Sequence, residues 1–174
     1  SKILKYLDLP IQHSHPEVLK RMGRAKTFEV FDEVFSYLRK KNPDFCLRTT
    51  VITGFPGETE EQFNHLVQYI RKIRFDRLGV FQFYSEKGTP AAELEHPVPA
   101  KVKRRRYETL MLTQQNIVFE KNRAWVGRNL DVIVESQTAS DQYIGRSFRD
   151  APDIDTFVEL ESKKSLNSGD IVSV

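Results

Sequence analysis

Over the first 125 residues, runs with the two-residue period of a strand are each followed by a stretch with the spacing of a helix. The strand-like runs are "KYLDLPIQ" (5–12), "FCLRTTVI" (45–52) and "DRLGVFQFY" (76–84). Strands that alternate with helices pair in parallel through right-handed crossovers, so this part is expected to be an α/β sheet or a section of a β/α barrel. Three such units do not close a barrel.

The helical stretches carry recognisable start signals. Thr59 followed by Gln62 fits a capping box, and a long helix is predicted from about Ala100 to Arg123. One apolar stripe of the middle helix contains Phe63, Leu66, Val67, Ile70 and Ile73. Such stripes predict helices that cover one face of the sheet.

The pattern changes at Val126. Short β-rich segments follow, with turn residues between them: "NLDVIVES", "QYIGRSF", "TFVELE" and "DIVSV". This is typical of a small antiparallel β-barrel. The predicted fold class is therefore α/β plus a small all-β domain, with domains at residues 1–125 and 126–174.

Composition restricts the class of protein further. The 39% hydrophobic content is enough for a packed core, and no apolar run is long enough to cross a bilayer. The amino-terminal residues lack the pattern of a secretory signal, so a cytoplasmic protein is expected. The single cysteine, Cys46, excludes an internal disulfide and a complete thiolate metal site, and we expect it to be a buried strand thiol.

The net charge of +3 hides an asymmetry between the two parts. Residues 126–174 contain nine acidic and five basic residues, a net charge of −4, which leaves +7 on residues 1–125. A module that binds nucleic acid normally presents a positive face. The charge therefore argues against nucleic acid as the partner of the second part.

Strand parity predicts polar side chains on one face of the sheet. They are Asp8 and Gln12, Arg48 and Thr50, and Gln82 and Tyr84. A parallel sheet covered on both faces reads as nearly continuous apolar residues, so this pattern indicates a polar cleft. Two interpretations stay open: a structural Asp8–Arg48 pair, or a cavity in which Arg48 meets the carboxylate or phosphate of a ligand.

Ligands of α/β folds gather at the carboxyl ends of the strands. Gln12 and His13 end the first strand, and "TGFPGET" follows the second, where Gly54 and Gly57 could bring backbone N–H groups to a ligand. His13 and His15 do not form a complete ligand set, so no metal is predicted, and both are expected to be exposed neighbours of a helix cap. No residue is a clear candidate for a catalytic acid, base or nucleophile.

Four segments in the same order resemble the radical S-adenosylmethionine (SAM) methylthiotransferases: "YLDLPIQHSHPEVLKRMGR", "RTTVITGFPGETEEQF", "FDRLGVFQFYSEKGTPAAEL" and "GRSFRDAPDID". The resemblance covers essentially the whole chain. It implies the later half of a radical SAM β/α barrel followed by a TRAM domain in which four of five strands are visible. The chain is thus expected to be a fragment of a longer enzyme, truncated at both ends.

The resemblance also implies cofactors. The family uses SAM and two 4Fe–4S clusters, whose cysteine ligands this chain lacks, so the fragment is expected to be inactive alone. Residues matching family segments that line the SAM pocket are Gln12, Arg48, Gly54 and, at the end of the third strand, Gln82.

The expected substrate depends on which branch of the family the chain resembles. The transfer-RNA branch resembles "PVQSGS" where this chain has "PIQHSH", and lacks "RDAPDID". The resemblance and the acidic second part therefore favour the branch that modifies an aspartate of the twelfth small-subunit ribosomal protein, free or on the ribosome. The expected substrate-binding residues are Arg146, Arg149, Asp150, Asp153 and Asp155.

Other interpretations stay open. The chain could belong to the transfer-RNA branch, or be a non-catalytic module that binds protein or RNA. Arg146 and Arg149 could simply pair with the neighbouring aspartates on a solvated turn. The basic "KVKRRR" run at 101–106 is expected to be a solvated helix face, with contact to ribosomal RNA as the alternative.

Overall fold

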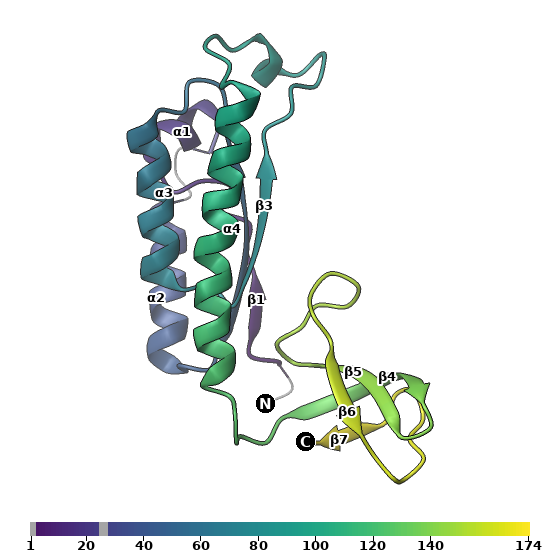
Figure 1. Ribbon diagram of the computed structural model, residues 1–174. Coiled ribbons are helices and arrows are strands. Elements are labelled where there is room, and N and C mark those ends of the chain that lie inside the picture. Colours follow the sequence, from purple (N-terminus) through teal and green to yellow (C-terminus); the bar gives the residue numbers. More distant parts are fainter. Residues whose placement is uncertain (1–2, 25–27) are drawn as a thin grey trace. The chain divides into compact units, whose positions relative to one another are not determined.

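The computed structural model describes residues 3–24 and 28–174, which form two compact units. The larger unit comprises residues 7–122, and the smaller one comprises residues 123–174 with residues 3–6. The expected fold class, an α/β part followed by a small antiparallel β part, is confirmed (Figure 1).

The larger part contains a three-stranded sheet with the order β1-β2-β3. Its elements are β1 (Tyr6–Asp8), α1 (Pro16–Arg21), α2 (Phe28–Lys41), β2 (Cys46–Thr53), α3 (Glu60–Ile73), β3 (Arg77–Gln82), the 3₁₀ turn η1 (Pro90–Glu93) and α4 (Ala100–Arg123). Strands β2 and β3 are parallel, as predicted. The chain after β1 extends the sheet, because the N–H of Leu9 donates to the Arg48 carbonyl (3.0 Å).

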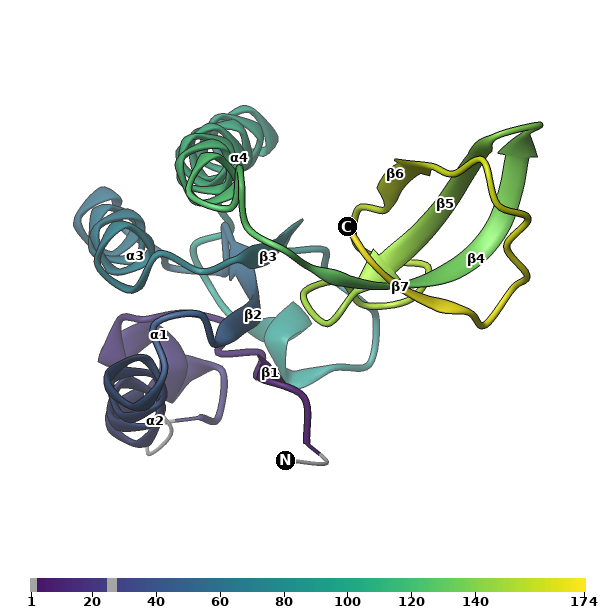
Figure 2. The same cartoon turned by 90° about the horizontal axis from the view of Figure 1, so that it is seen from below.

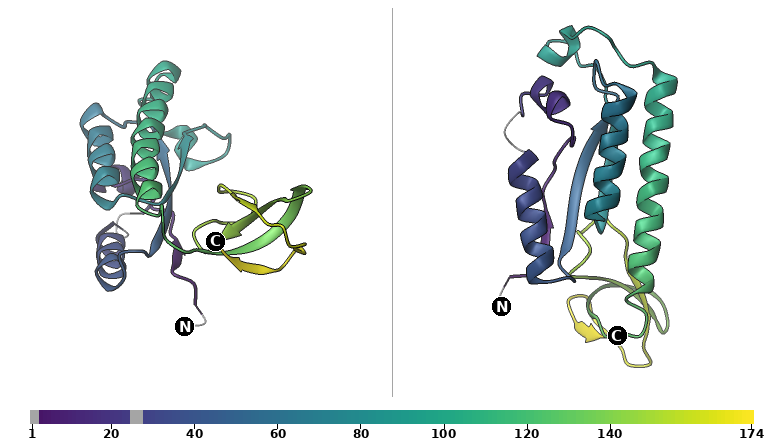
Figure 3. Two further views of the ribbon diagram at one scale, coloured as in Figure 1. Left: turned by 60° about the horizontal axis from the view of Figure 1, so that its bottom comes forward. Right: turned by 90° about the vertical axis from the view of Figure 1, so that its left-hand side faces the viewer.

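Helices α2, α3 and α4 all lie on one face of this sheet (Figure 2) and run alongside its strands (Figure 3). The predicted capping box at the start of α3 is present: the Gln62 N–H donates to Thr59 Oγ1, and the Gln62 side chain accepts from the Thr59 N–H. The apolar stripe of α3 packs with the strands in one core, whose fully buried members include Ile11, Leu47, Val51, Leu66 and Ile70.

Strand β2 follows the predicted parity. Leu47, Thr49 and Val51 are buried under the helices, while Arg48 and Thr50 are half-buried on the opposite, open face. Among the described residues no α-helix covers that open face (Figure 2). Cys46 is fully buried, as expected of a structural thiol.

The parity argument was wrong for β3. Gln82 pairs with Thr53, and Arg48 pairs with Arg77, so Gln82 lies on the helix-covered face and not on the face of Arg48. Gln82 shares the face of the buried Val80 but is exposed, because the strand end extends beyond the cover of the core. Tyr84 lies beyond the strand and is 87% exposed.

The opposite end of the sheet is held by a buried carboxylate. Asp76, which immediately precedes β3, accepts hydrogen bonds from Arg39 of α2 (2.6 Å), Lys121 of α4 (2.9 Å) and the Leu47 N–H of β2 (3.0 Å). One side chain therefore connects two helices and a strand.

The smaller unit is a four-stranded antiparallel sheet with the order β6-β5-β4-β7. Its strands are β4 (Asp131–Ala139), β5 (Gln142–Ser147), β6 (Val158–Glu161) and β7 (Ile171–Ser173), each inside a predicted segment or overlapping it. Val132, Val134, Tyr143 and Leu160 form its core. Gly145 is required by a close backbone approach, because a Cβ there would lie 2.4 Å from the Ile133 carbonyl oxygen.

Candidate functional site

The backbone turns at Gln12, at the carboxyl end of the first strand. Gln12 has a left-handed backbone (φ 65°), yet its N–H donates to the Thr50 carbonyl (2.9 Å) and its carbonyl accepts from the Ile52 N–H (2.8 Å). The ladder to β2 therefore continues up to Gln12. The next residue, His13, then turns into the protein.

His13 is completely buried, so the expectation that it is exposed was wrong. Its Nδ1 accepts a hydrogen bond from the His15 N–H (2.9 Å), which places the proton on Nε2. Nε2 therefore donates to Glu58 Oε1 (3.3 Å), and this partner makes burial of the ring possible. His15 does act as a helix cap, because its ring accepts from the Glu17 N–H at the start of α1.

Glu58 is the centre of a buried polar network that sequence reasoning missed. Arg106 of α4 donates through Nη1 to Glu58 Oε2 (3.0 Å) and to the Glu58 carbonyl (3.1 Å), and the Gly54 N–H donates to the same carboxylate. The side chains of Glu58 and Arg106 are 0% and 4% exposed. Glu58 therefore joins the end of the first strand, the loop after β2 and helix α4.

Arg106 corrects the expectation that the "KVKRRR" run is entirely a solvated face. It lies four residues before Leu110 and faces inward, whereas Arg104 lies outside and pairs with Glu108. Lys103 also turns inward and donates to the Phe83 carbonyl (2.9 Å). The available signal was helical phase: residues 103, 106 and 110 recur at spacings of three and four.

Gly54 and Gly57 both have φ +76°, which favours glycine. A Cβ on Gly54 would lie 2.2 Å from Lys103 Cγ, so the protein's own side chain fills that space. The Gly54 N–H donates to Glu58 and the Gly57 N–H donates to the His96 carbonyl (2.8 Å). The expectation that these N–H groups are offered to a ligand was therefore wrong. Gly54 shapes the loop.

Arg48 lies on the open face beside Asp8, with 2.7 Å between Nη1 and Oδ2. The ion pair of the structural interpretation is therefore formed. In it, the Arg48 side chain is 13% exposed and the Asp8 side chain is 41% exposed. The Arg48 guanidinium, on a half-covered polar surface with Thr50 on the same face, can donate hydrogen bonds to a carboxylate or phosphate of a ligand. Contact of Gln12, Arg48, Gly54 or Gln82 with a cofactor stays a prediction.

The five residues predicted to bind substrate lie in or beside one loop of the smaller unit, but they are not equivalent. Asp150 is buried and accepts from the Ser147 hydroxyl (2.7 Å), and Asp155 accepts from the Ala151 N–H (2.9 Å). Asp153 has φ 61° and is exposed. Asp150 and Asp155 therefore shape the loop, and Asp153 faces solvent.

The two arginines of this group have different neighbours. Arg146 pairs with Glu135 of β4 (2.8 Å), which differs from the alternative interpretation in which it pairs with the loop aspartates. Arg149 is buried, with its guanidinium carbon 4.8 Å from the centre of the Trp125 ring. Arg128 stacks on that ring at 3.8 Å. The loop therefore rests on the only tryptophan of the chain.

Burial lowers the pKa of His13 from its ordinary value of 6.5, and Glu58 opposes this shift without cancelling it. The unfolded chain thus binds a proton that the folded chain does not. The free energy of unfolding is expected to fall as the pH drops below about 6.5, and His13 alone contributes at most about 1.4 kcal/mol per pH unit to this slope. Urea unfolding between about pH 7.5 and pH 5.5 measures this slope.

His65 must be separated from His13 in that measurement, because burial lowers its pKa as well. The His13→Gln and His65→Gln variants should each lose part of the slope. An unchanged slope in His13→Gln would show that this ring does not titrate with unfolding.

Within residues 3–24 and 28–174, no group of three or more His, Cys, Asp or Glu side chains is arranged to hold a metal ion. The single cysteine cannot ligate an iron–sulfur cluster by itself, so the residues present do not fit such a cluster. No helix of the described chain is long and apolar enough to span a membrane.

Comparison with known families agrees with the two-part architecture. A model of the Radical SAM superfamily matches residues 2–70, and a model of the TRAM domain matches residues 126–174. A solved radical SAM enzyme, the coproporphyrinogen III oxidase HemN of Escherichia coli, is 20% identical with a TM-score of 0.48, covering 68% of this chain and 26% of its own.

Three of the similar proteins carry the description ribosomal protein uS12 methylthiotransferase RimO. The protein of Carboxydothermus hydrogenoformans is 49% identical over 99% of this chain and 40% of its own length. That of Desulfitobacterium hafniense is 45% identical over 99% of this chain and 39% of its own. That of Synechococcus sp. RCC307 is 50% identical over 92% of this chain and 33% of its own length. The chain thus spans about two fifths of these relatives' length.

Proposed function

We propose that this chain, which belongs to the radical SAM methylthiotransferases, is part of an enzyme that adds a methylthio group to the β-carbon of an aspartate in the twelfth small-subunit ribosomal protein. The observation that carries the proposal is identity of 45–50% to relatives of that name over nearly the whole chain. The ribosomal substrate makes the cytoplasm the proposed location. We place the domain boundary between Trp125 and Val126, and the TRAM match over 126–174 supports it.

Within that enzyme, we assign this part of the chain two roles. The first is to form one wall of the SAM site, with Arg48 on the open face of the sheet and Gln12 at its carboxyl end. SAM, when bound, supplies the radical precursor and the methyl group. The Glu58 network supports this wall, because it fixes the loop after β2 and the segment that follows Gln12. Clusters of the whole enzyme need ligands from outside these residues.

The second role is to dock the substrate protein on the loop of the smaller unit. Asp153 is exposed, and two large apolar side chains beside it, Ile154 and Phe157, are 67% and 57% exposed. An acidic tip with adjacent apolar groups suits a segment rich in Lys and Arg, and it disfavours the phosphates of transfer RNA. Because Asp150 and Asp155 shape the loop, Asp153 is its main charged contact.

The test is methylthiolation by the full-length protein, loaded anaerobically with iron and sulfide, offered the ribosomal protein or transfer RNA. We expect modification of the ribosomal protein only. Asp153→Lys should lower kcat/KM for it at least about tenfold, whereas Asp141→Lys, the same charge reversal in a different turn, should not. Modification of transfer RNA alone would overturn the proposal.

The same assay tests the cofactor wall. Arg48→Ala is expected to raise the KM for SAM about tenfold or more, the usual effect of removing a charge-assisted hydrogen bond. Asp8→Asn removes the ion pair but keeps the guanidinium, so it separates the two interpretations of Arg48. Equal effects of both variants would leave Arg48 only the structural role.

A further inference from the structure

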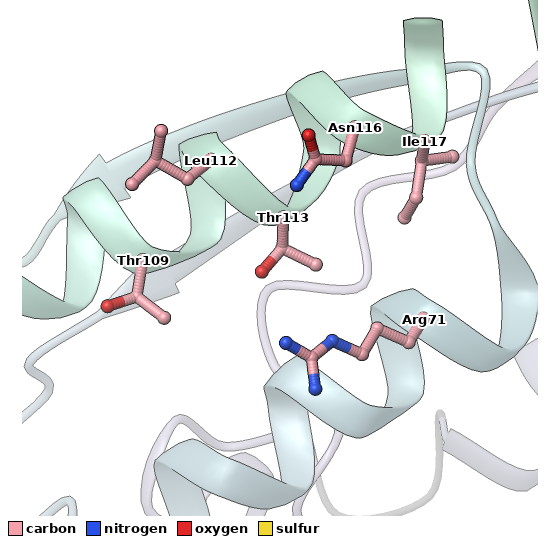
Figure 4. A pocket seen from close by; sticks show the side chains of 6 residues that line it. All are labelled: Arg71, Thr109, Leu112, Thr113, Asn116 and Ile117. Atoms are coloured by element: carbon pink, nitrogen blue, oxygen red, sulfur yellow. The ribbon is translucent and has the colours of Figure 1, made fainter. Parts of the chain in front are cut away.

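A groove between α3 and α4 lies on the outer side of the helices, apart from the carboxyl end of the sheet. It encloses about 330 Å³ and is lined by Arg71 of α3 and by Thr109, Leu112, Thr113, Asn116 and Ile117 of α4. Thr109, Thr113 and Ile117 point from α4 toward α3, where the Arg71 side chain extends along the groove (Figure 4). The volume is at the lower end of the range of ligand sites.

Three polar side chains in this groove have no hydrogen-bond partner within the described chain: Arg71, Thr113 and Asn116. Thr113 is 8% exposed and its side chain points toward α3 (Figure 4), while Arg71 and Asn116 are exposed. A guanidinium, a hydroxyl and a carboxamide together can supply hydrogen bonds to one anionic oxygen group.

The ends of the groove are held by ion pairs between the two helices. Arg106 and Arg105 pair with Glu60 at the start of α3, and Arg74, just after α3, pairs with Glu120. These pairs neutralise the neighbouring arginines, so Arg71 is the free cation of the groove as far as the described residues show. A nucleic-acid backbone needs several free cations in a row, which this surface does not offer.

The wall of the groove on α4 continues as an apolar stripe. Leu112, Asn116 and Phe119 lie on one side of α4, at spacings of four and three residues. The side chains of Leu112 and Phe119 are 61% and 69% exposed. Seven residues of helix span about 10 Å, which is longer than a small carboxylic acid. The stripe matches the spacing of apolar anchors on a partner helix that lies in a groove.

We propose that this groove docks an amphipathic protein helix that places an Asp or Glu carboxylate on Arg71 and Thr113 and its apolar face on Leu112 and Phe119. Complementary charge selects the partner, and the apolar stripe supplies contact area. This site shares no residue with the SAM wall or with the acidic loop. It does not depend on the function proposed above.

The probe is a synthetic amphipathic helical peptide with one central Glu on its apolar face, compared with the same peptide carrying Gln. By fluorescence anisotropy, the Glu peptide is expected to bind this chain about tenfold more tightly than the Gln peptide. Arg71→Gln should remove the preference, and Thr113→Val should reduce it. Arg104→Gln removes a charge from α4 outside the groove and should leave the preference unchanged.

Each alternative outcome is distinguishable. Equal binding of the two peptides, no binding of either, or a preference that survives Arg71→Gln would overturn the proposal. Displacement of the Glu peptide by a short RNA, but not by acetate at equal ionic strength, would identify a phosphate site instead. Circular dichroism shows whether each variant is folded, and the surface position of Arg71 makes loss of folding a small risk.

Discussion

Replacing Glu58 by Gln is expected to lower the free energy of unfolding of this chain by about 3 kcal/mol or more. The substitution keeps the shape but removes the buried one of the two carboxylates that compensate Arg106, whose side chain is 4% exposed. A neutral amide also places an N–H₂ donor among three donors: His13 Nε2, the Gly54 N–H and Arg106. At least one buried donor then lacks an acceptor, which is costly. Urea unfolding followed by circular dichroism measures the loss.

Glu108→Gln is the matched control, since it removes the same charge from a side chain that is 54% exposed and pairs with the exposed Arg104. Its effect should stay within about 1 kcal/mol, as is usual for surface ion pairs. Combining Glu58→Gln with Arg106→Met should recover part of the stability, because the uncompensated charge is removed as well. Equal losses in Glu58→Gln and Glu108→Gln would mean that the buried network contributes little.

Asp76→Asn is expected to cause a second large loss, also about 3 kcal/mol. Burial pushes the pKa of Asp76 upward, but Lys121 and Arg39 outweigh it and hold the pKa below its ordinary value. The carboxylate therefore stays charged, and its loss leaves two cations without their shared partner. Asp32→Asn, which removes the exposed pair with Lys72, is the control and should have a small effect.

The pH dependence gives an independent check on Asp76. Because its folded pKa lies below the unfolded value of 3.8, its contribution is complete above about pH 4 and is lost as the pH falls through the folded value. The difference in unfolding free energy between the wild type and Asp76→Asn should therefore close in acid. A difference that persists at low pH would show that the charge of Asp76 is not what stabilises the fold.

Much of the fold follows from local pattern. The start of α3 at its capping box and the whole of α4 agree with the sequence, as do the parallel order of β2 and β3 and the four strands of the smaller unit. These features depend on residues close together in the chain. Helical and strand periods, caps and turn residues act over a few positions, so a single sequence contains the information.

The face of Gln82 shows where local pattern is insufficient. Its parity with Val80 was correct, but which face of β3 meets the open face of β2 depends on the register between two strands. That register is set by packing of the core, not by the sequence of either strand. The same holds for Arg146, whose partner Glu135 lies across a strand pair.

The sequence by itself determined the class of the protein: alternating strand and helix, an acidic β-rich second part, one cysteine and the motifs of a methylthiotransferase. Only the tertiary structure decided which titratable side chains are buried and with what partners. His13 meets Glu58 over 45 residues of chain, and Arg106 meets it over 48. Burial of a charge is stable only when such a distant partner arrives, so helical phase could mark Arg106 as inward-facing, but no local signal could identify its partners.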